Sequence, residues 1–225
     1  SEIYRPTLFD LLAHTALEFY KTDEPNITRP ADKFEIDGPE LFCDPFTFMR
    51  IEIDTTDHTA MQPKALLLYQ QLLKFHVPDA IPYPFIEVDL ERLQFIYTHT
   101  TVAAKDAQYL EVLNNIISAM KGGAGTDLYL FEIAALYRQQ GNTYQPKVQA
   151  EHRWRFKEAL TLCDSVIGQY PGSRGADKCK ALKSQIMAKE LQLATEQYIA
   201  INSPARLLVT YKNHTDLQLT AYKIS

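Results

Sequence analysis

Apolar residues recur every three or four positions over most of the chain, a spacing that predicts helices with one buried face. The first predicted helix begins at Pro6 and ends near Tyr20. Its apolar face comprises Leu8, Leu11, Leu12, Thr15, Ala16 and Phe19. Further helices are predicted over residues 63–76, 87–99, 106–121, 127–140 and 150–170, and from 174 into the 190s. Short loops between them favour antiparallel helical hairpins.

Residues 21–62 interrupt the helical spacing. Prolines are frequent here and exclude long helices, yet aromatic and aliphatic residues in the same segment still require burial. We therefore expect an ordered but irregular segment that wraps around the helices, with a short strand at Phe46–Ile53.

The helix predicted at 150–170 carries the spacing of a known helical repeat. Ala159, Cys163, Val166 and Pro171 occupy the key positions of the second helix of a tetratricopeptide repeat, A-x-x-x-F-x-x-A-x-x-x-x-P. Residues 142–156 are inserted where that repeat normally turns tightly, and ordinary helical hairpins also use alanine and proline. The pattern predicts a mainly α fold built from antiparallel helical hairpins of tetratricopeptide-like type.

The C-terminal residues change to a period of two, which predicts strands. Apolar residues alternate on both sides of a break at Asn213–Asp216, with Leu207, Val209 and Tyr211 before it and Leu217, Leu219 and Ala221 after it. We divide the chain into a helical domain, 1–200, and a β-hairpin, 201–225. Because a lone hairpin is marginally stable in water, we expect it to pack on the helices or on the strand at 46–53.

Composition and charge narrow the classes of partner. The chain has 225 residues, of which 46% are hydrophobic, enough for a substantial core. The net charge of −5 is concentrated in residues 1–60, and the mildly basic remainder does not indicate a nucleic-acid partner. No apolar stretch approaches the roughly 20 residues of a membrane span. The three cysteines do not form a disulfide framework, and we expect Cys163 and Cys179 to be buried thiols, not a bridge.

No motif predicts catalysis, a cofactor or a metal. Residues 121–127, KGGAGTD, look like a phosphate loop but follow a helix and lack the terminal Gly-Lys-Ser/Thr, so we favour a linker with Asp127 as N-cap. Glu87 and Glu91 share a helix face and could act as an acid–base pair, but carboxylates in a first helical turn are favoured by the helix dipole alone. The six histidines are scattered without metal-ligand spacing. The sequence therefore predicts a protein that is not an enzyme.

Residues 152–157, HRWRFK, combine basic and aromatic side chains that could stack on nucleic-acid bases. We favour a helix start at which the aromatic side chains face the core and the basic ones remain in solvent. If this surface contacts a protein, the candidate contact residues are Arg153, Trp154, Arg155 and Phe156.

Several segments resemble the region near the N-terminus of bacterial α2-macroglobulin-like proteins of the Bacteroidetes type. These segments are residues 3–37, 65–80, 89–97 and 202–225. The resemblance implies a tetratricopeptide-like helical region followed by a string of β-sandwich domains, of which 201–225 is the truncated start. It also implies an envelope-associated protein, in the periplasm or membrane-anchored through sequence absent here, that inhibits proteases. The Cys-x-Glu-Gln thioester motif of that family does not occur in this chain.

Two functions follow from these patterns. The first is a non-catalytic scaffold or protein-docking region of an α2-macroglobulin-like protease inhibitor, whose partners are proteases or envelope components. The second is a stand-alone tetratricopeptide-like adaptor in an envelope complex, which binds peptides or protein partners in a concave groove. A pure scaffold predicts buried Trp154, Phe156 and Tyr170, whereas a peptide-binding repeat predicts exposed aromatic residues along a groove.

Overall fold

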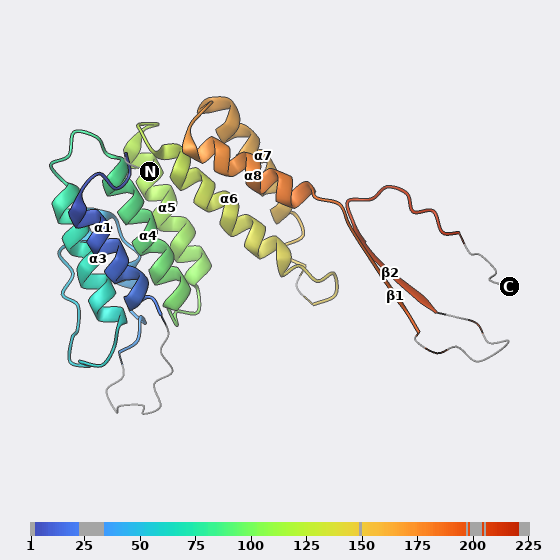
Figure 1. The fold of residues 1–225 in the computed structure, drawn as a ribbon, viewed down its shortest axis with the longest axis horizontal. Coiled ribbons are helices and arrows are strands. Elements are labelled where there is room, and N and C mark those ends of the chain that lie inside the picture. The colour runs from blue at the N-terminus through green and yellow to red at the C-terminus, as the bar shows by residue number, and fades with distance from the viewer. Residues whose placement is uncertain are drawn as a thin grey trace.

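The structure, a computed structural model, describes residues 3–22, 34–148, 150–196, 198, 204 and 206–220. Within these residues the chain forms eight α-helices, one short 3-10 helix and two β-strands. The fold is mainly helical, as the sequence predicts, with a small antiparallel sheet of two strands. The helices stack side by side, and the sheet extends away from the last of them (Figure 1).

The long helices agree with those predicted, although several of their ends differ. They are α1 (Leu8–Tyr20), α3 (Gln62–His76), α4 (Tyr83–His99), α5 (Lys105–Met120), α6 (Thr126–Asn142), α7 (Arg155–Gln169) and α8 (Arg174–Met187). Helix α4 begins before the predicted residue 87, α7 begins after the predicted residue 150, and α8 ends before the 190s. Among the described residues, no helix is long and apolar enough to cross a membrane.

Helix α1 buries a different face from the one its leucines predict. It starts at Leu8 with Thr7 as N-cap, and Thr7 and Asp10 form a reciprocal capping box, so Pro6 lies outside the helix. The buried residues are Asp10, Ala13, His14 and Leu17. The predicted apolar face is largely exposed: the exposed fractions of Leu8, Leu11 and Leu12 are 69%, 62% and 60%. The polar residues Asp10 and His14 tolerate burial because they meet His76 and Glu91.

The segment before α3 is irregular, as predicted, but it contains no strand at Phe46–Ile53. A helical turn, α2 (Pro45–Phe48), occupies this position, after a short 3-10 helix, η1 (Pro39–Leu41). Asp44 caps α2, because its Oδ1 accepts hydrogen bonds from the amides of Phe46 and Thr47 at 2.9 and 3.1 Å. Proline follows Asp44 directly, which favours a helix start over a strand. The predicted irregular residues 23–33 lie outside the described part of the chain.

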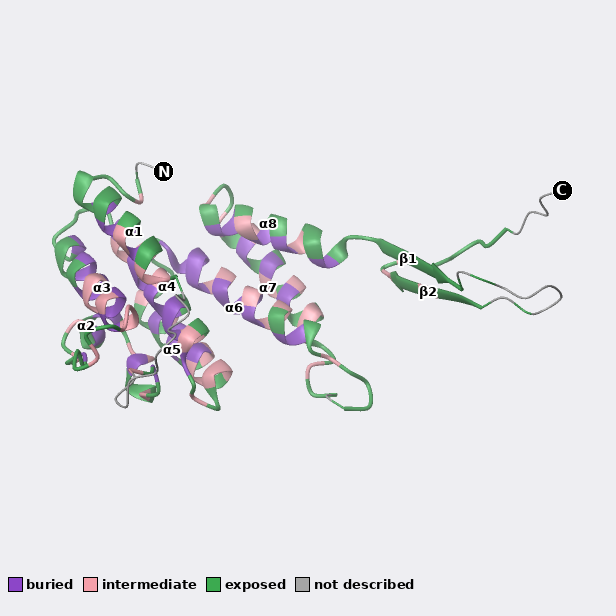
Figure 2. Ribbon diagram, turned by 60° about the horizontal axis from the view of Figure 1, so that its bottom comes forward, coloured by how far each residue is buried: buried purple, intermediate pink, exposed green. Residues whose placement is uncertain are grey.

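Three apolar cores follow one another along the stack, and each is shared by neighbouring helices (Figure 2). The first lies between α1, α3, α4 and the irregular segment, the second between α4, α5 and α6, and the third between α6, α7 and α8. Cys163 and Cys179 are buried free thiols in the third core, as predicted. Since successive cores share a helix, burial is continuous from α1 to α8.

The sheet pairs different strands from those predicted. Strand β2 (Leu207–Lys212) is where the sequence places it, but its partner is β1 (Glu190–Thr195), which the sequence assigns to the end of a helix. Residues 216–220, which include most of the predicted second strand, have no regular structure. Asn213 does not begin a hairpin turn. Its side-chain amide donates hydrogen bonds to the carbonyls of Ile186 and Ala188 at 2.8 and 2.9 Å, at the C-terminal end of α8.

Candidate functional site

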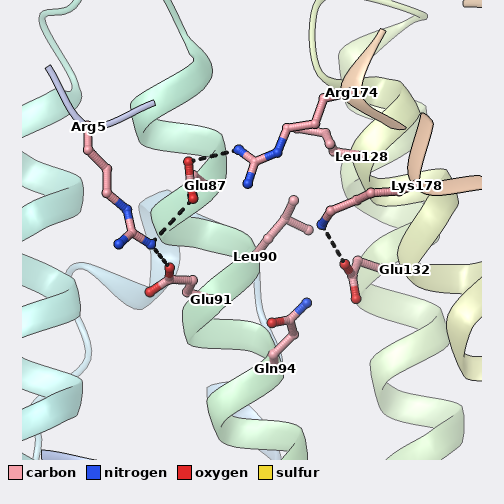
Figure 3. A pocket seen from close by; sticks show the side chains of 9 residues that line it. All are labelled: Arg5, Glu87, Leu90, Glu91, Gln94, Leu128, Glu132, Arg174 and Lys178. Atoms are coloured by element: carbon pink, nitrogen blue, oxygen red, sulfur yellow. Dashed lines mark hydrogen bonds and ion pairs between the residues drawn. The ribbon is translucent and has the colours of Figure 1, made fainter. Parts of the chain in front are cut away.

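A polar cavity of about 260 Å³ opens between α4 on one side and α6 and α8 on the other (Figure 3). We call it the inner groove. Its lining residues are Arg5, Glu87, Leu90, Glu91, Gln94, Leu128, Glu132, Arg174 and Lys178. Apart from Arg5, they lie on three helices, so the groove exists only because α4, α6 and α8 are placed side by side. It contains three carboxylates and three basic side chains.

The helical period explains why these residues meet. On α4 the lining residues follow the spacing i, i+3, i+4 and i+7, which places them on one face of the helix. Leu128 and Glu132 on α6, and Arg174 and Lys178 on α8, are both i, i+4 pairs. Each helix therefore presents one stripe to the groove, and its other faces pack into the cores.

Glu87 connects the N-terminal segment to α8 across α4. Its Oε1 lies 3.4 Å from Nη2 of Arg5, and its Oε2 lies 3.2 Å from Nη1 of Arg174. The Arg174 guanidinium also lies 4.1 Å from the ring centroid of Tyr4. Both oxygens of Glu87 are thus engaged by protein groups.

Glu91 is also fully engaged. Its carboxylate pairs with Arg5, with Nδ1 of His14 at 3.3 Å and with Nζ of Lys21 at 3.4 Å. Burial raises the pKa of Glu91, but the hydrogen bond from His14 and the charges of Lys21 and Arg5 outweigh it, so this pKa is lowered. Glu91 is therefore a stable anion that holds α1 on α4.

Glu132 differs from both. Only 6% of its surface is exposed, and its Oε1 has no hydrogen-bond partner among the described residues. Nζ of Lys178 lies 4.0 Å from this oxygen, too far for a hydrogen bond, while the Tyr109 hydroxyl donates to Oε2 at 3.4 Å. Burial raises the pKa of Glu132 above its usual range, although Gln94, Lys178 and Tyr109 oppose the rise. The groove thus contains one carboxylate with an unsatisfied oxygen.

Sequence reasoning identified Glu87 and Glu91 as structural residues, but it gave the wrong reason for their position. Helix α4 has no acidic residue in its first turn, so the helix dipole does not explain them, whereas the contacts to Arg5 and Arg174 do. Sequence reasoning missed Glu132 and Lys178 altogether. One signal was present, because Glu132 is the only charged residue between Asp127 and Arg138, inside an apolar stretch.

Residues 121–125 form the linker between α5 and α6 that the sequence predicts, but Asp127 is not the N-cap of α6. Gly125 takes that position with φ of 84°, and a Cβ there would lie 2.3 Å from Ile86. Asp127 instead accepts a hydrogen bond from the Gly175 amide at 2.8 Å, which fixes the start of α8 on α6. Arg174 and Lys178 are positioned at the groove through this contact.

The four predicted contact residues lie at the start of α7, outside the inner groove. Trp154 is 58% exposed, so the prediction that it faces the core is wrong. The Arg153 guanidinium lies 4.8 Å from the Trp154 ring, and Arg155 lies 4.6 Å from the ring of Tyr137. Phe156 is half-buried against the third core, which agrees with the core-facing prediction. Trp154 is exposed because α7 begins only at Arg155, so that Trp154 belongs to the turn before the helix.

Trp154 and Tyr137 line a second, more apolar groove of about 720 Å³ between α5, α6 and α7. Of these two aromatic residues, Trp154 is exposed and Tyr137 is half-buried. No protein-family model, curated protein or solved structure matches this chain.

Proposed function

We propose that this chain is a non-catalytic protein-docking region of tetratricopeptide-like type. In this proposal it forms the N-terminal helical part of an α2-macroglobulin-like protease-inhibitor protein of the bacterial cell envelope. The resemblance of residues 3–37, 65–80, 89–97 and 202–225 supports the family. The partners would be proteases or other envelope proteins.

The packing of the last three helices supports the repeat type. Helices α6, α7 and α8 each contact the other two, as consecutive helices of a repeat stack do. Each of the three helices has a small, fully buried residue: Ala134 on α6, Ala159 on α7 and Ala176 on α8. A Cβ on Gly175 would lie 2.5 Å from the carbonyl oxygen of Asp127, so only glycine permits the observed approach of α8 to α6.

The observation that carries the proposal is the one-sided character of the β1–β2 sheet. In the observed register, Leu191 faces Tyr211, Leu193 faces Val209 and Thr195 faces Leu207, which places all six on one face. The other face carries four polar residues, Glu190, Gln192, Thr210 and Lys212, together with the pair Ala194 and Leu208. Leu191, Leu193 and Tyr211 are all exposed. An isolated pair of strands is marginally stable in water, so this apolar face requires a covering sheet, as the first strands of a β-sandwich would have.

Amide hydrogen exchange tests this proposal. Residues 1–225 are compared with the full product of the same gene, and protection is measured at the amides of β1 and β2. We expect fast exchange in the short chain and strong protection in the full product, because a second sheet covers the apolar face there. A reading frame that stops near Ser225, or equal exchange in both proteins, would contradict the macroglobulin proposal.

The inner groove favours a second function, peptide docking by a stand-alone adaptor. The specific observation is Glu132, a buried carboxylate in the lining of the inner groove whose Oε1 lacks a hydrogen-bond partner among the described residues. Panning residues 1–225 against phage-displayed random 12-residue peptides tests this function, because a random library does not depend on which partner the chain binds. Recovery of peptides that bind in solution supports it, and failure to recover any after repeated rounds counts against it.

A further inference from the structure

Glu132 and Lys178 form an incomplete pair at one end of the inner groove (Figure 3). A buried acceptor without a partner destabilises a protein, and most buried polar atoms in proteins are satisfied. Lys178 does not satisfy Oε1 of Glu132, because its Nζ lies 4.0 Å from this oxygen, too far for a hydrogen bond. The same Nζ lies 4.8 Å from the ring centroid of Phe131. Within the described part of the chain, the pair thus keeps one free acceptor and free N–H donors close together.

The other charged groups of the groove are already occupied. Glu87 is held by Arg5 and Arg174, and Glu91 by Arg5, His14 and Lys21. Among the charged groups of the lining, Glu132 and Lys178 therefore offer a ligand new hydrogen bonds, and the exposed Gln94 amide lies in the same lining. Leu90 and Leu128 supply the apolar part of the lining.

The balance of charge favours a neutral ligand at this end. Three basic side chains oppose three carboxylates around the cavity, so neither a free cation nor a free anion meets a field of one sign. A main-chain segment of a peptide is neutral and offers both a donor and an acceptor. In an extended chain, the N–H and C=O of one residue point to the same side, as they do between paired antiparallel strands.

We propose that Glu132 and Lys178 bind the main chain of one extended residue of a partner peptide. The N–H of that residue donates to Oε1 of Glu132, and Nζ of Lys178 donates to its carbonyl oxygen. The inference rests on the peptide-docking function proposed above. The volume of the cavity, about 260 Å³, is slightly smaller than the about 300–1,000 Å³ that is typical of ligand pockets. The cavity therefore suits a short extended segment instead of a helix.

Variants of Glu132 distinguish a main-chain ligand from a cationic one. A peptide selected by panning is labelled, and its Kd is measured by fluorescence anisotropy for wild type, Glu132→Gln, Glu132→Leu and Lys178→Met. Glutamine keeps an acceptor oxygen, so Glu132→Gln should bind within about threefold of wild type, whereas Glu132→Leu and Lys178→Met should each weaken binding about tenfold. Glu111→Gln and Lys180→Met are matched controls on exposed positions outside the groove and should leave Kd unchanged.

A second measurement uses the unaltered protein, in case a Glu132 variant folds poorly. Each amide of the selected peptide is N-methylated in turn, which removes one N–H donor. Methylation of one position should weaken binding to the wild-type protein about tenfold, because the N–H of that position is the donor to Oε1 of Glu132, whereas methylation elsewhere removes no donor to this carboxylate.

Three results would overturn the inference. Equal loss in Glu132→Gln and Glu132→Leu, with a required lysine or arginine in the peptide, shows that the carboxylate binds a cation. Peptides that bind all groove variants equally show that docking occurs on another surface, and the docking function then stands while the inference fails. Panning that yields no peptide at all removes the docking function and the inference together.

Discussion

Nε2 of His76 lies 2.6 Å from Oδ1 of Asp10, and both side chains are fully buried. Nδ1 of the same imidazole lies 2.7 Å from Oδ2 of Asp79. Asp10 also closes the capping box of α1 with Thr7. This one carboxylate therefore sets both the start of α1 and its attachment to the end of α3.

Replacing Asp10 by alanine should destabilise the chain by about 3 kcal/mol, because the change leaves a buried histidine with one partner fewer and removes a helix cap. Urea unfolding followed by circular dichroism at pH 7 measures the loss. Glu18→Ala is the matched control, since Glu18 is an exposed acid of the same helix, and it should change stability by under about 0.5 kcal/mol. Similar effects of both variants would contradict the role assigned to Asp10.

The same carboxylate predicts a pH dependence of stability. Burial raises the pKa of Asp10, but hydrogen bonds from Thr7 and the interaction with His76 outweigh it, so the folded-state pKa is lowered. The stabilisation is therefore present above the pKa of an unfolded aspartate, about 3.9, and is lost as the pH falls through the lower folded-state value. We expect the unfolding free energy of Asp10→Asn to decline less steeply below about pH 4 than that of wild type. Parallel curves for the two proteins would count against this coupling, and Glu18→Gln should follow wild type.

Arg92 fastens the irregular segment to the helices. Its fully buried guanidinium donates to Asp89 at 2.7 Å, to the Cys43 carbonyl at 2.6 Å and to the Leu41 carbonyl at 3.3 Å. Arg92→Met should cost about 3–5 kcal/mol, because Asp89 would then be buried without its charge partner. Limited proteolysis should cut residues 34–60 faster in this variant. Arg50→Met, at an exposed position of the same segment, should leave the cleavage rate unchanged.

The helices could be predicted from the sequence because the apolar period of a helix is visible within the helix itself. Which face a helix buries can depend instead on residues far away in the sequence. In α1 the leucines form the most apolar stripe, and yet Asp10 and His14 are buried. Their partners come from α3 and α4; His76 is 66 positions away from Asp10. No pattern within a single helix reveals such pairs. The inner groove escaped prediction for the same reason, since Glu132 and Lys178 meet only after α6 and α8 pack.

The sheet shows the same limit. Residues 190–195 follow α8 closely, and their leucines do not by themselves exclude a longer helix. They become a strand because β2 offers a partner and because Asn213 closes the end of α8. A residue that the sequence assigns to a turn thus acts as a cap for a distant helix. The predicted position of β2 was right, since its own alternation is local.

Asn213 should therefore control how the sheet is attached to α8. Its φ of 55° lies in the left-handed region, which asparagine and glycine tolerate best. Asn213→Gly keeps that backbone but loses both side-chain bonds to α8, whereas Asn213→Ala loses the bonds and strains the backbone. We expect faster amide exchange in β1 and β2 for glycine than for wild type, and faster still for alanine. Unchanged exchange in both variants would show that pairing of β1 with β2 alone holds the sheet.

Glu132→Gln should stabilise the free protein at pH 7. Because burial raises the pKa of Glu132, its ionised form is disfavoured in the fold, and the resulting loss of stability is complete above the raised folded-state pKa. The advantage of glutamine should vanish below about pH 4, where Glu132 is protonated in both states. Glu91→Gln is the matched control with the opposite sign: the pKa of Glu91 is lowered, so its loss should destabilise the protein at pH 7. Urea unfolding at both pH values measures these differences. A destabilised Glu132→Gln at pH 7 would mean that the Lys178 pair holds the fold together, whereas the expected gain marks Glu132 as a carboxylate that costs stability until a partner supplies its missing hydrogen bond.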